Sequence, residues 1–84
     1  MKVHLPTHLR SYSAGAASLD VEGRTVREIL DALEARSAGF RIRVLDEQDR
    51  IRPHIKVFVG QEQVRSFDAP VSAEVTIVGA LSGG

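Results

Sequence analysis

The residues with the clearest chemical meaning are Gly83 and Gly84, which follow an apolar run and a small uncharged segment in "IVGALSGG". An α-carboxylate has an ordinary pKa of about 3.3–3.7, so at neutral pH it is an anion and a poor electrophile. Glycine has no Cβ, so a carboxyl group behind two glycines can be threaded into another protein with close backbone approach. Glycine pairs also occur at frayed chain ends. The pair is therefore compatible with a functional terminus that enters another protein and with a frayed end that has no function.

The rest of the sequence offers no catalytic constellation. Its serines and histidines form no nucleophile elbow, and neither a phosphate-binding loop nor a dinucleotide fingerprint is present. His4 and His8 are four residues apart, but Pro6 lies between them, and on a strand they would be about 13 Å apart, too far to share an ion. His54 stands alone. We therefore expect no metal site and no enzymatic activity of the chain on its own.

Composition narrows the class of protein further. The 84 residues suffice for one small domain, and the absence of cysteine excludes disulfides, thiolate metal sites and a persulfide carried on this chain. Eleven basic residues balance eleven acidic ones, so neither nucleic acid nor a membrane surface is an expected partner. No apolar run approaches the roughly 20 residues of a membrane span, and we expect a cytoplasmic protein.

Two strands are expected before the first helical pattern. Apolar and polar residues alternate over Val3–Leu5 until Pro6 disturbs the pairing, and they alternate again in "SLDVEG" at positions 18–23. The segment "SYSAG" between them predicts a hairpin with a loose turn.

One main helix follows. Apolar residues recur at helical spacing over Val26–Leu33, and Thr25 with Glu28 forms a capping box at the start. Gly39 is the expected left-handed stop, with Arg36 near the negative end of the helix dipole.

The second half alternates at the period of strands. "FRIRVL" at positions 40–45 predicts a strand, and "HIKVFV" at positions 54–59 predicts another. Gly60 can take the positive φ of a tight reversal, which leads to a short segment around Val64. A last strand is expected at Val75–Ile77.

The resulting order, β-β-α-β-β-β, predicts an α+β fold in which one main helix covers one face of a mixed sheet. With the first and last strands side by side at the centre, this is the β-grasp layout. It would project the residues after Val78 into solvent. We expect a β-grasp domain at residues 1–78 and a flexible tail at residues 79–84.

Nearly the whole chain resembles the MoaD/ThiS family of ubiquitin-like sulfur carrier proteins. The resemblance rests on the element order, on "RPHIKVFVGQEQVR" at positions 52–65 and on the terminal "GALSGG". It implies that a ubiquitin-activating-type enzyme, using ATP, adenylates the carboxylate of Gly84, which is then converted to a thiocarboxylate. Gly83 would supply clearance in that active site. No cofactor would be bound by the chain itself.

The resemblance also assigns roles near the tail. It implies an apolar docking surface on the sheet for partner enzymes, for which Phe58, Val78 and Leu81 are the candidates. Many relatives carry proline just before the tail, where this chain has Gly79, and we expect that glycine to loosen the root of the tail. The tail residues ahead of the sulfur-carrying Gly84 are Gly79, Ala80, Leu81, Ser82 and Gly83.

Several functions remain compatible with this pattern. As a carrier, the chain would receive sulfur from a sulfurtransferase persulfide or from sulfide. It would deliver that sulfur to an enzyme making cysteine, thiamine thiazole, molybdopterin or a specialised metabolite. It could instead be a protein modifier joined to lysine, the small subunit of molybdopterin synthase, or a binding module with an inert tail. Conjugates with lysine would favour the modifier, and stable co-purification with a larger subunit would favour the molybdopterin synthase subunit. Unchanged activity after loss of Gly84 would favour the binding module.

A local excess of arginine lies between the helix and the later strands. We interpret it as a solvated face compensated by nearby acidic residues. The alternative is an electrostatic docking patch for an acidic partner surface. The residues concerned are Arg36, Arg41, Arg43, Arg50 and Arg52.

Overall fold

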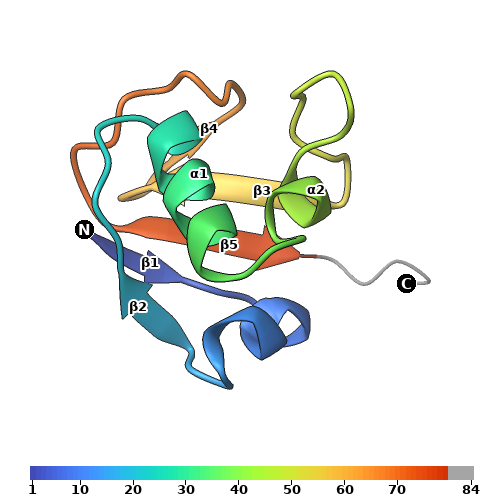
Figure 1. Ribbon diagram of the computed structural model, residues 1–84. Coiled ribbons are helices and arrows are strands. Elements are labelled where there is room, and N and C mark those ends of the chain that lie inside the picture. Colours follow the sequence, from blue (N-terminus) through green and yellow to red (C-terminus); the bar gives the residue numbers. More distant parts are fainter. Residues whose placement is uncertain (80–84) are drawn as a thin grey trace.

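The computed structural model describes residues 1–79, which form a five-stranded mixed sheet with one main helix across one face (Figure 1). The strands are β1 (Lys2–His4), β2 (Ser18–Asp20), β3 (Ile55–Val59), β4 (Glu62–Val64) and β5 (Val75–Gly79), and the helices are η1 (Thr7–Ser13), α1 (Val26–Arg36) and α2 (Arg41–Val44). The strand order is β2-β1-β5-β3-β4. Only the central pair, β1 and β5, is parallel. The predicted α+β, β-grasp class is confirmed.

Helix α1 begins where the capping residues predict. The Thr25 hydroxyl accepts the backbone N–H of Glu28 at 3.2 Å. In return the Glu28 carboxylate accepts the backbone N–H of Arg24 at 2.9 Å, one residue before the N-cap. These bonds satisfy amides that the helix leaves without a partner. The apolar stripe of α1 faces the sheet, and its four core positions are all buried.

The core lies between α1 and the sheet, with additional side chains from η1 and α2. Every strand position predicted to face inward on β3 and β5 is buried, and within residues 1–79 no polar side chain is buried. The buried apolar residues are Val3, Leu5, Leu9, Val21, Val26, Ile29, Leu30, Leu33, Phe40, Val44, Leu45, Ile55, Val57, Val59, Val71, Val75 and Ile77.

The strand predicted at positions 40–45 is wrong, because this segment forms the short helix α2. Phe40, Val44 and Leu45 are buried, whereas Ile42 is 46% exposed. Phe40 and Val44 are four residues apart, which is a helical spacing, and an alternating strand would have buried Ile42 between them. Leu45 follows the helix in extended backbone and pairs with Ile51 in an isolated bridge. The three residues fill the core beside the end of α1, which the local alternation of arginine and apolar residues does not reveal.

The connection between the first two strands also differs from the prediction. The antiparallel hairpin is confirmed, with Val3 opposite Leu19. Its connection, however, is the helix η1 rather than a loose turn. Leu9 anchors η1 because it is fully buried in the core. The chain then turns back at Ala14 and Gly15, both with positive φ.

The later reversal follows the prediction. Gly60 has a φ of 60° in the two-residue connection between β3 and β4, where Val59 pairs with Glu62. Positive φ at the first position only is typical of a type II′ hairpin turn. The short segment around Val64 is the edge strand β4. No helix within residues 1–79 is long and apolar enough to span a bilayer.

Candidate functional site

The carboxyl end of β5 is the centre of the candidate site, because the predicted tail begins there. Gly79 is the last residue of β5 and pairs with Ile55 of β3, so it lies in the sheet and not in the tail predicted at residues 79–84. The end of β5 lies between η1 and α2 (Figure 1). Ala80, Leu81, Ser82, Gly83 and Gly84 lie outside the described residues, and the predictions on them stay predictions.

Gly79 is in close contact with His8 of η1. A Cβ built on Gly79 would lie 2.0 Å from Cε1 and 2.8 Å from Nε2 of the His8 ring. Gly79 is not among the positive-φ residues, so a side chain at this position is opposed by the ring of the exposed His8 and not by backbone conformation. A side chain at position 79 would displace the imidazole. The sequence had suggested that this glycine loosens the root of the tail, but the structure shows it packed against a ring.

A hollow of about 320 Å³ lies beside this contact, between η1 and β5. Its lining combines apolar side chains of β5 with polar ones of η1. The residues that line it are Pro6, Thr7, His8, Arg10, Ile77, Val78 and Gly79. A partner that approached the end of β5 would therefore meet this hollow next to Gly79.

The sheet face opposite α1 carries the two predicted docking residues that the structure describes. Val78 is 42% exposed and Phe58 is half-buried, and both point away from the core. Val78 pairs with Lys56 and Phe58 pairs with Thr76 on adjacent strands. The two apolar side chains are thus diagonal neighbours on one face, within reach of a single partner surface.

The histidines that the sequence places four residues apart have separate partners. His4 Nε2 lies 3.1 Å from a carboxylate oxygen of Glu74, and His8 packs on Gly79. Within residues 1–79 no three His, Asp, Glu or Cys side chains converge as they would around a metal ion.

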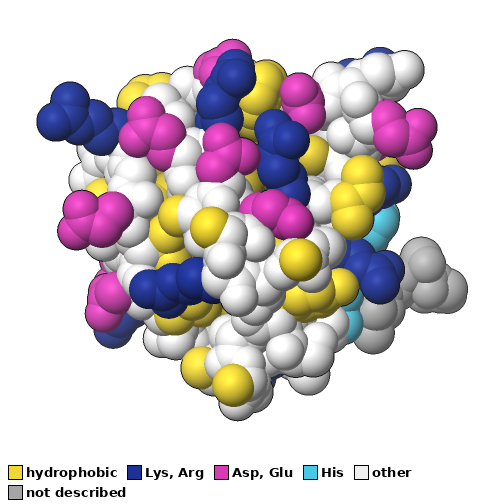
Figure 2. Space-filling view, viewed as in Figure 1, with side chains coloured by type: hydrophobic (Ala, Val, Ile, Leu, Met, Phe, Trp, Pro, Cys, Tyr) yellow, Lys and Arg dark blue, Asp and Glu magenta, His cyan; other side chains and the backbone are white. Residues whose placement is uncertain are grey.

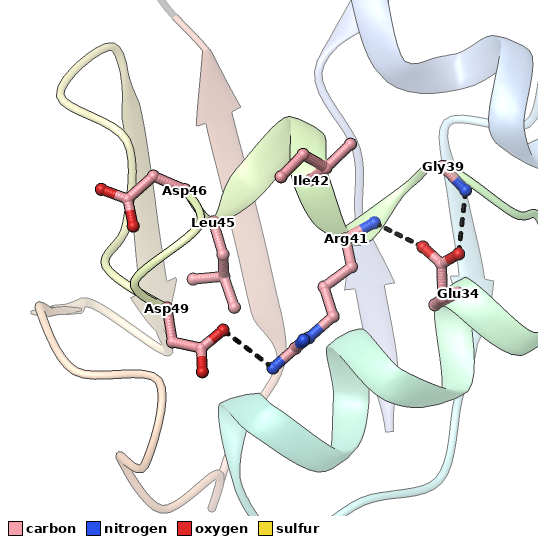
Figure 3. Close-up of a pocket in the computed structure, with 7 residues that line it drawn as sticks. All are labelled: Glu34, Gly39, Arg41, Ile42, Leu45, Asp46 and Asp49. Atoms are coloured by element: carbon pink, nitrogen blue, oxygen red, sulfur yellow. Dashed lines mark hydrogen bonds and ion pairs between the residues drawn. The ribbon is translucent and has the colours of Figure 1, made fainter.

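A second hollow, of about 340 Å³, lies where α1 meets α2 (Figure 3). The Glu34 carboxylate accepts the backbone N–H groups of Arg41 and Gly39, each at 2.9 Å. These bonds hold the pKa of Glu34 below its ordinary value, and the bond from the Arg41 N–H has the larger effect. The Arg41 guanidinium lies 3.2 Å from Asp31 and 3.3 Å from Asp49. Since its charges pair with one another, this cluster holds α2 in place.

The loop after α2 is organised by a similar device. The Asp46 carboxylate accepts the backbone N–H of Gln48 at 2.8 Å and that of Arg50 at 3.0 Å. These bonds, led by that of Arg50, lower the pKa of Asp46. Two of the arginines in the predicted basic patch, Arg41 and Arg50, are therefore paired with aspartates.

Comparison with known proteins adds to this geometry. No protein-family model matches the chain. Over 89 residues, however, the chain is 30% identical to the sulfur carrier protein CysO of Mycobacterium tuberculosis, with 98% of this chain and 96% of the relative covered. The chain belongs to the ubiquitin-like sulfur carrier proteins of the MoaD/ThiS type. The predicted carrier role is thereby confirmed, and these relatives are small carriers rather than enzymes.

Solved structures of similar proteins have the same fold. A chain of the Amycolatopsis orientalis BexX/CysO complex matches with a TM-score of 0.89 and 36% identity, covering 99% of this chain and 98% of that one. SAMP1 of Haloferax volcanii, a small archaeal modifier protein, matches with a TM-score of 0.72 and 28% identity, covering 100% and 98%. The sulfur carrier fold therefore extends over the whole described chain.

Proposed function

We propose that the carboxylate of Gly84 is adenylated and then converted to a thiocarboxylate, which donates its sulfur to a biosynthetic enzyme. The observation that carries this proposal is the likeness to the sulfur carrier CysO along nearly the full length of both proteins. The Gly83–Gly84 pair supports it, because only unbranched residues leave room around a carboxyl carbon that must enter another active site.

The chemistry proceeds in two displacements on a partner enzyme. A carboxylate oxygen of Gly84 attacks the α-phosphorus of ATP, and pyrophosphate leaves. Hydrosulfide then attacks the carbonyl carbon of the acyl adenylate, AMP leaves, and a thiocarboxylate remains. If a sulfurtransferase persulfide supplies the sulfur, the product is first an acyl disulfide. A thiol then cleaves its S–S bond, releasing the thiocarboxylate and forming a disulfide.

The chain itself holds the start of its last residues in a fixed place and provides a surface to which the activating enzyme can bind. With Gly79 paired in β5, the sheet fixes the point from which the last residues start. We propose that Val78 and Phe58, with Leu81, form the apolar surface that the activating enzyme buries. The 42% exposure of Val78 supports this residue as the anchor of the proposed surface. Neither a bound cofactor nor a catalytic residue of this chain enters the mechanism.

An intact-mass measurement tests the proposal. The protein is incubated with ATP, an adenylating enzyme of the ubiquitin-activating type and sulfide, and its mass is compared with that of the untreated protein. We expect a gain equal to the replacement of one oxygen by one sulfur. A matched variant with one residue added after Gly84 should show no gain. Absence of the gain in the unextended protein, with an enzyme that loads CysO under the same conditions, would refute the proposal.

A protein-modifier role is the second candidate, and the likeness to SAMP1, a small archaeal modifier protein, favours it. The same activated carboxyl group would then be transferred to a lysine amine, forming an isopeptide bond. Recovery of this chain from cells under denaturing conditions distinguishes the two roles. Conjugates with a Gly84–lysine linkage would support the modifier, whereas free thiocarboxylate alone would support the carrier.

The remaining partners follow from the same proposal. A sulfur donor is required because the chain has no cysteine to hold a persulfide. The acceptor is an enzyme making cysteine, thiamine thiazole, molybdopterin or a specialised sulfur metabolite. The cytoplasmic location and the absence of nucleic-acid and membrane partners stay predictions.

A further inference from the structure

Three arginines around the end of β5 share an unusual arrangement, and we refer to Arg10, Arg43 and Arg52 as the collar arginines. Each donates a hydrogen bond from Nε to a fixed oxygen of the protein: Arg10 to the Leu5 carbonyl at 3.2 Å, Arg43 to the Tyr12 hydroxyl at 3.0 Å and Arg52 to the Ile42 carbonyl at 2.7 Å. The guanidinium groups are thereby oriented, and their Nη groups donate no hydrogen bond to any other residue within positions 1–79.

The collar arginines have no carboxylate partner within residues 1–79. Arg27 lies 2.6 Å from Asp68, Arg41 lies 3.2 Å from Asp31, and Arg50 lies 3.4 Å from Asp46. Among the described residues Arg24, Arg36 and Arg65 also lack a carboxylate partner, but none of these three lines the two hollows at the end of β5. Arg43 is exposed, and Arg10 and Arg52 are half-buried. The collar therefore presents oriented positive charge that the described part of the chain does not neutralise.

The collar arginines lie on both sides of Gly79. Arg10 lines the hollow between η1 and β5 described above. Arg43 and Arg52 line a neighbouring hollow of about 280 Å³, together with Ile42 and His54. His54 directly precedes Ile55, the residue that pairs with Gly79. Neither lining includes Asp or Glu, and Figure 2 shows histidine and basic side chains gathered at this edge of the molecule.

We propose that the collar arginines bind Asp and Glu side chains on the rim of the protein that takes up the tail. This inference rests on the proposed function, in which the last residues enter a partner, and it adds the charge that the rim must carry. Oriented guanidinium groups bind carboxylates through paired N–H bonds. Because the chain as a whole has no net charge, such a local field steers one end of the molecule toward a complementary surface.

A peptide titration tests the collar independently of sulfur transfer. The ¹⁵N-labelled full chain is titrated with hexaglutamate, and the backbone and arginine Nε signals are followed by NMR. We expect the shifts to concentrate in η1, in α2 and at residues 52–55. The R10Q/R43Q/R52Q variant should bind about tenfold more weakly, as the loss of three partly exposed ion pairs would produce. Raising the ionic strength should weaken wild-type binding in the same way.

The matched control removes three charges elsewhere. R24Q/R36Q/R65Q removes three arginines that also lack a carboxylate partner within residues 1–79 and that line neither hollow, and it should bind within about twofold of the wild type if local geometry decides. Equal weakening in both triple variants, or shifts centred on the three control arginines, would overturn the proposal. Tighter binding of oligothymidine than of hexaglutamate would also overturn it, because the surface would then favour nucleic acid.

Single variants and a separate sulfur-loading assay distinguish loss of folding from loss of binding. Each single variant is titrated as well, and its circular dichroism is recorded, so a triple variant that does not fold leaves the test intact. The intact-mass assay is performed on the unaltered chain. Failure of sulfur loading with a collar that still binds the peptide therefore counts against the proposed function alone, and the opposite outcome counts against the collar alone.

Discussion

The imidazole ring of His8 occupies the space that a side chain at Gly79 would need, with Cε1 only 2.0 Å from the position of a Cβ. This contact joins η1 to the last residue of β5. Since η1 is anchored in the core through the buried Leu9, the contact connects the start of the predicted tail to the body of the domain. Glycine at this position therefore serves close packing, although in a strand it is the less favourable residue.

A double-mutant cycle tests this contact. Gly79→Ala should destabilise the protein by about 1 kcal/mol, because His8 must rotate away from the new methyl group. In a His8→Ala background the same substitution should stabilise by about 0.5 kcal/mol, since alanine loses less backbone entropy than glycine in a strand. Urea unfolding of the four proteins gives the coupling energy. Strictly additive effects would contradict the contact.

Substitution of Val78 separates docking from folding. Val78→Asp places a charge on the exposed sheet face and should leave the free energy of unfolding within about 0.5 kcal/mol of the wild type. We expect it to lower kcat/KM for sulfur loading by roughly tenfold or more, because an apolar anchor is lost. Val78→Thr, which keeps the shape, is the matched control and should have the smaller effect. Unchanged loading of Val78→Asp would exclude this face as the docking surface.

The Glu34 carboxylate should make stability sensitive to acid. Its pKa is lowered by the N–H groups of Arg41 and Gly39, so the folded state binds fewer protons than the unfolded state below the ordinary pKa of about 4.3. The stabilisation is complete above that value and is lost as the pH falls through the lower, folded-state pKa. Glu34→Gln should therefore be less stable at neutral pH and should lose less stability on acidification.

Urea midpoints measured between about pH 7 and pH 2 show both effects. Asp46→Asn is the comparison variant. It also removes a carboxylate whose pKa is lowered, but that carboxylate binds amides of the loop after α2 and not those at the start of α2. Equal pH profiles for the wild type and Glu34→Gln would contradict the role of this carboxylate in holding α2.

Two alanine substitutions distinguish a helix at residues 41–44 from the strand that alternation predicts. Val44 is fully buried and Ile42 is 46% exposed. Val44→Ala should cost about 2 kcal/mol, through lost burial and the cavity left behind. Ile42→Ala should stay within about 0.5 kcal/mol. In a strand both side chains would share a face, so similar losses in urea unfolding would contradict the helix.

Much of the fold followed from local pattern. The span of α1 rests on a capping box and an apolar stripe, which are properties of neighbouring residues. The inward faces of β3 and β5 rest on strict alternation, because one face of the sheet is buried. Gly60 was identifiable since a two-residue hairpin requires positive φ there. The family was recognisable from the element order and the Gly83–Gly84 pair.

Other features depend on contacts between distant parts of the chain. The segment at residues 40–45 alternates like a strand, yet the core takes up Phe40 and Val44 at helical spacing, and Leu45 only after the helix has ended. Gly79 appeared to be a flexible root, but the ring it contacts lies 71 positions earlier in the sequence.

The arginine patch shows most clearly which features the sequence determines and which features depend on the tertiary structure. The sequence by itself determined that the chain carries balanced charge, a β-grasp body and a glycine pair at Gly83–Gly84. Only the tertiary structure decided which arginines meet aspartates and which, within residues 1–79, lie near Gly79 without a carboxylate partner. The physical reason is that ion pairing depends on distances of a few ångströms, and those distances are set when η1, α2 and β5 come together.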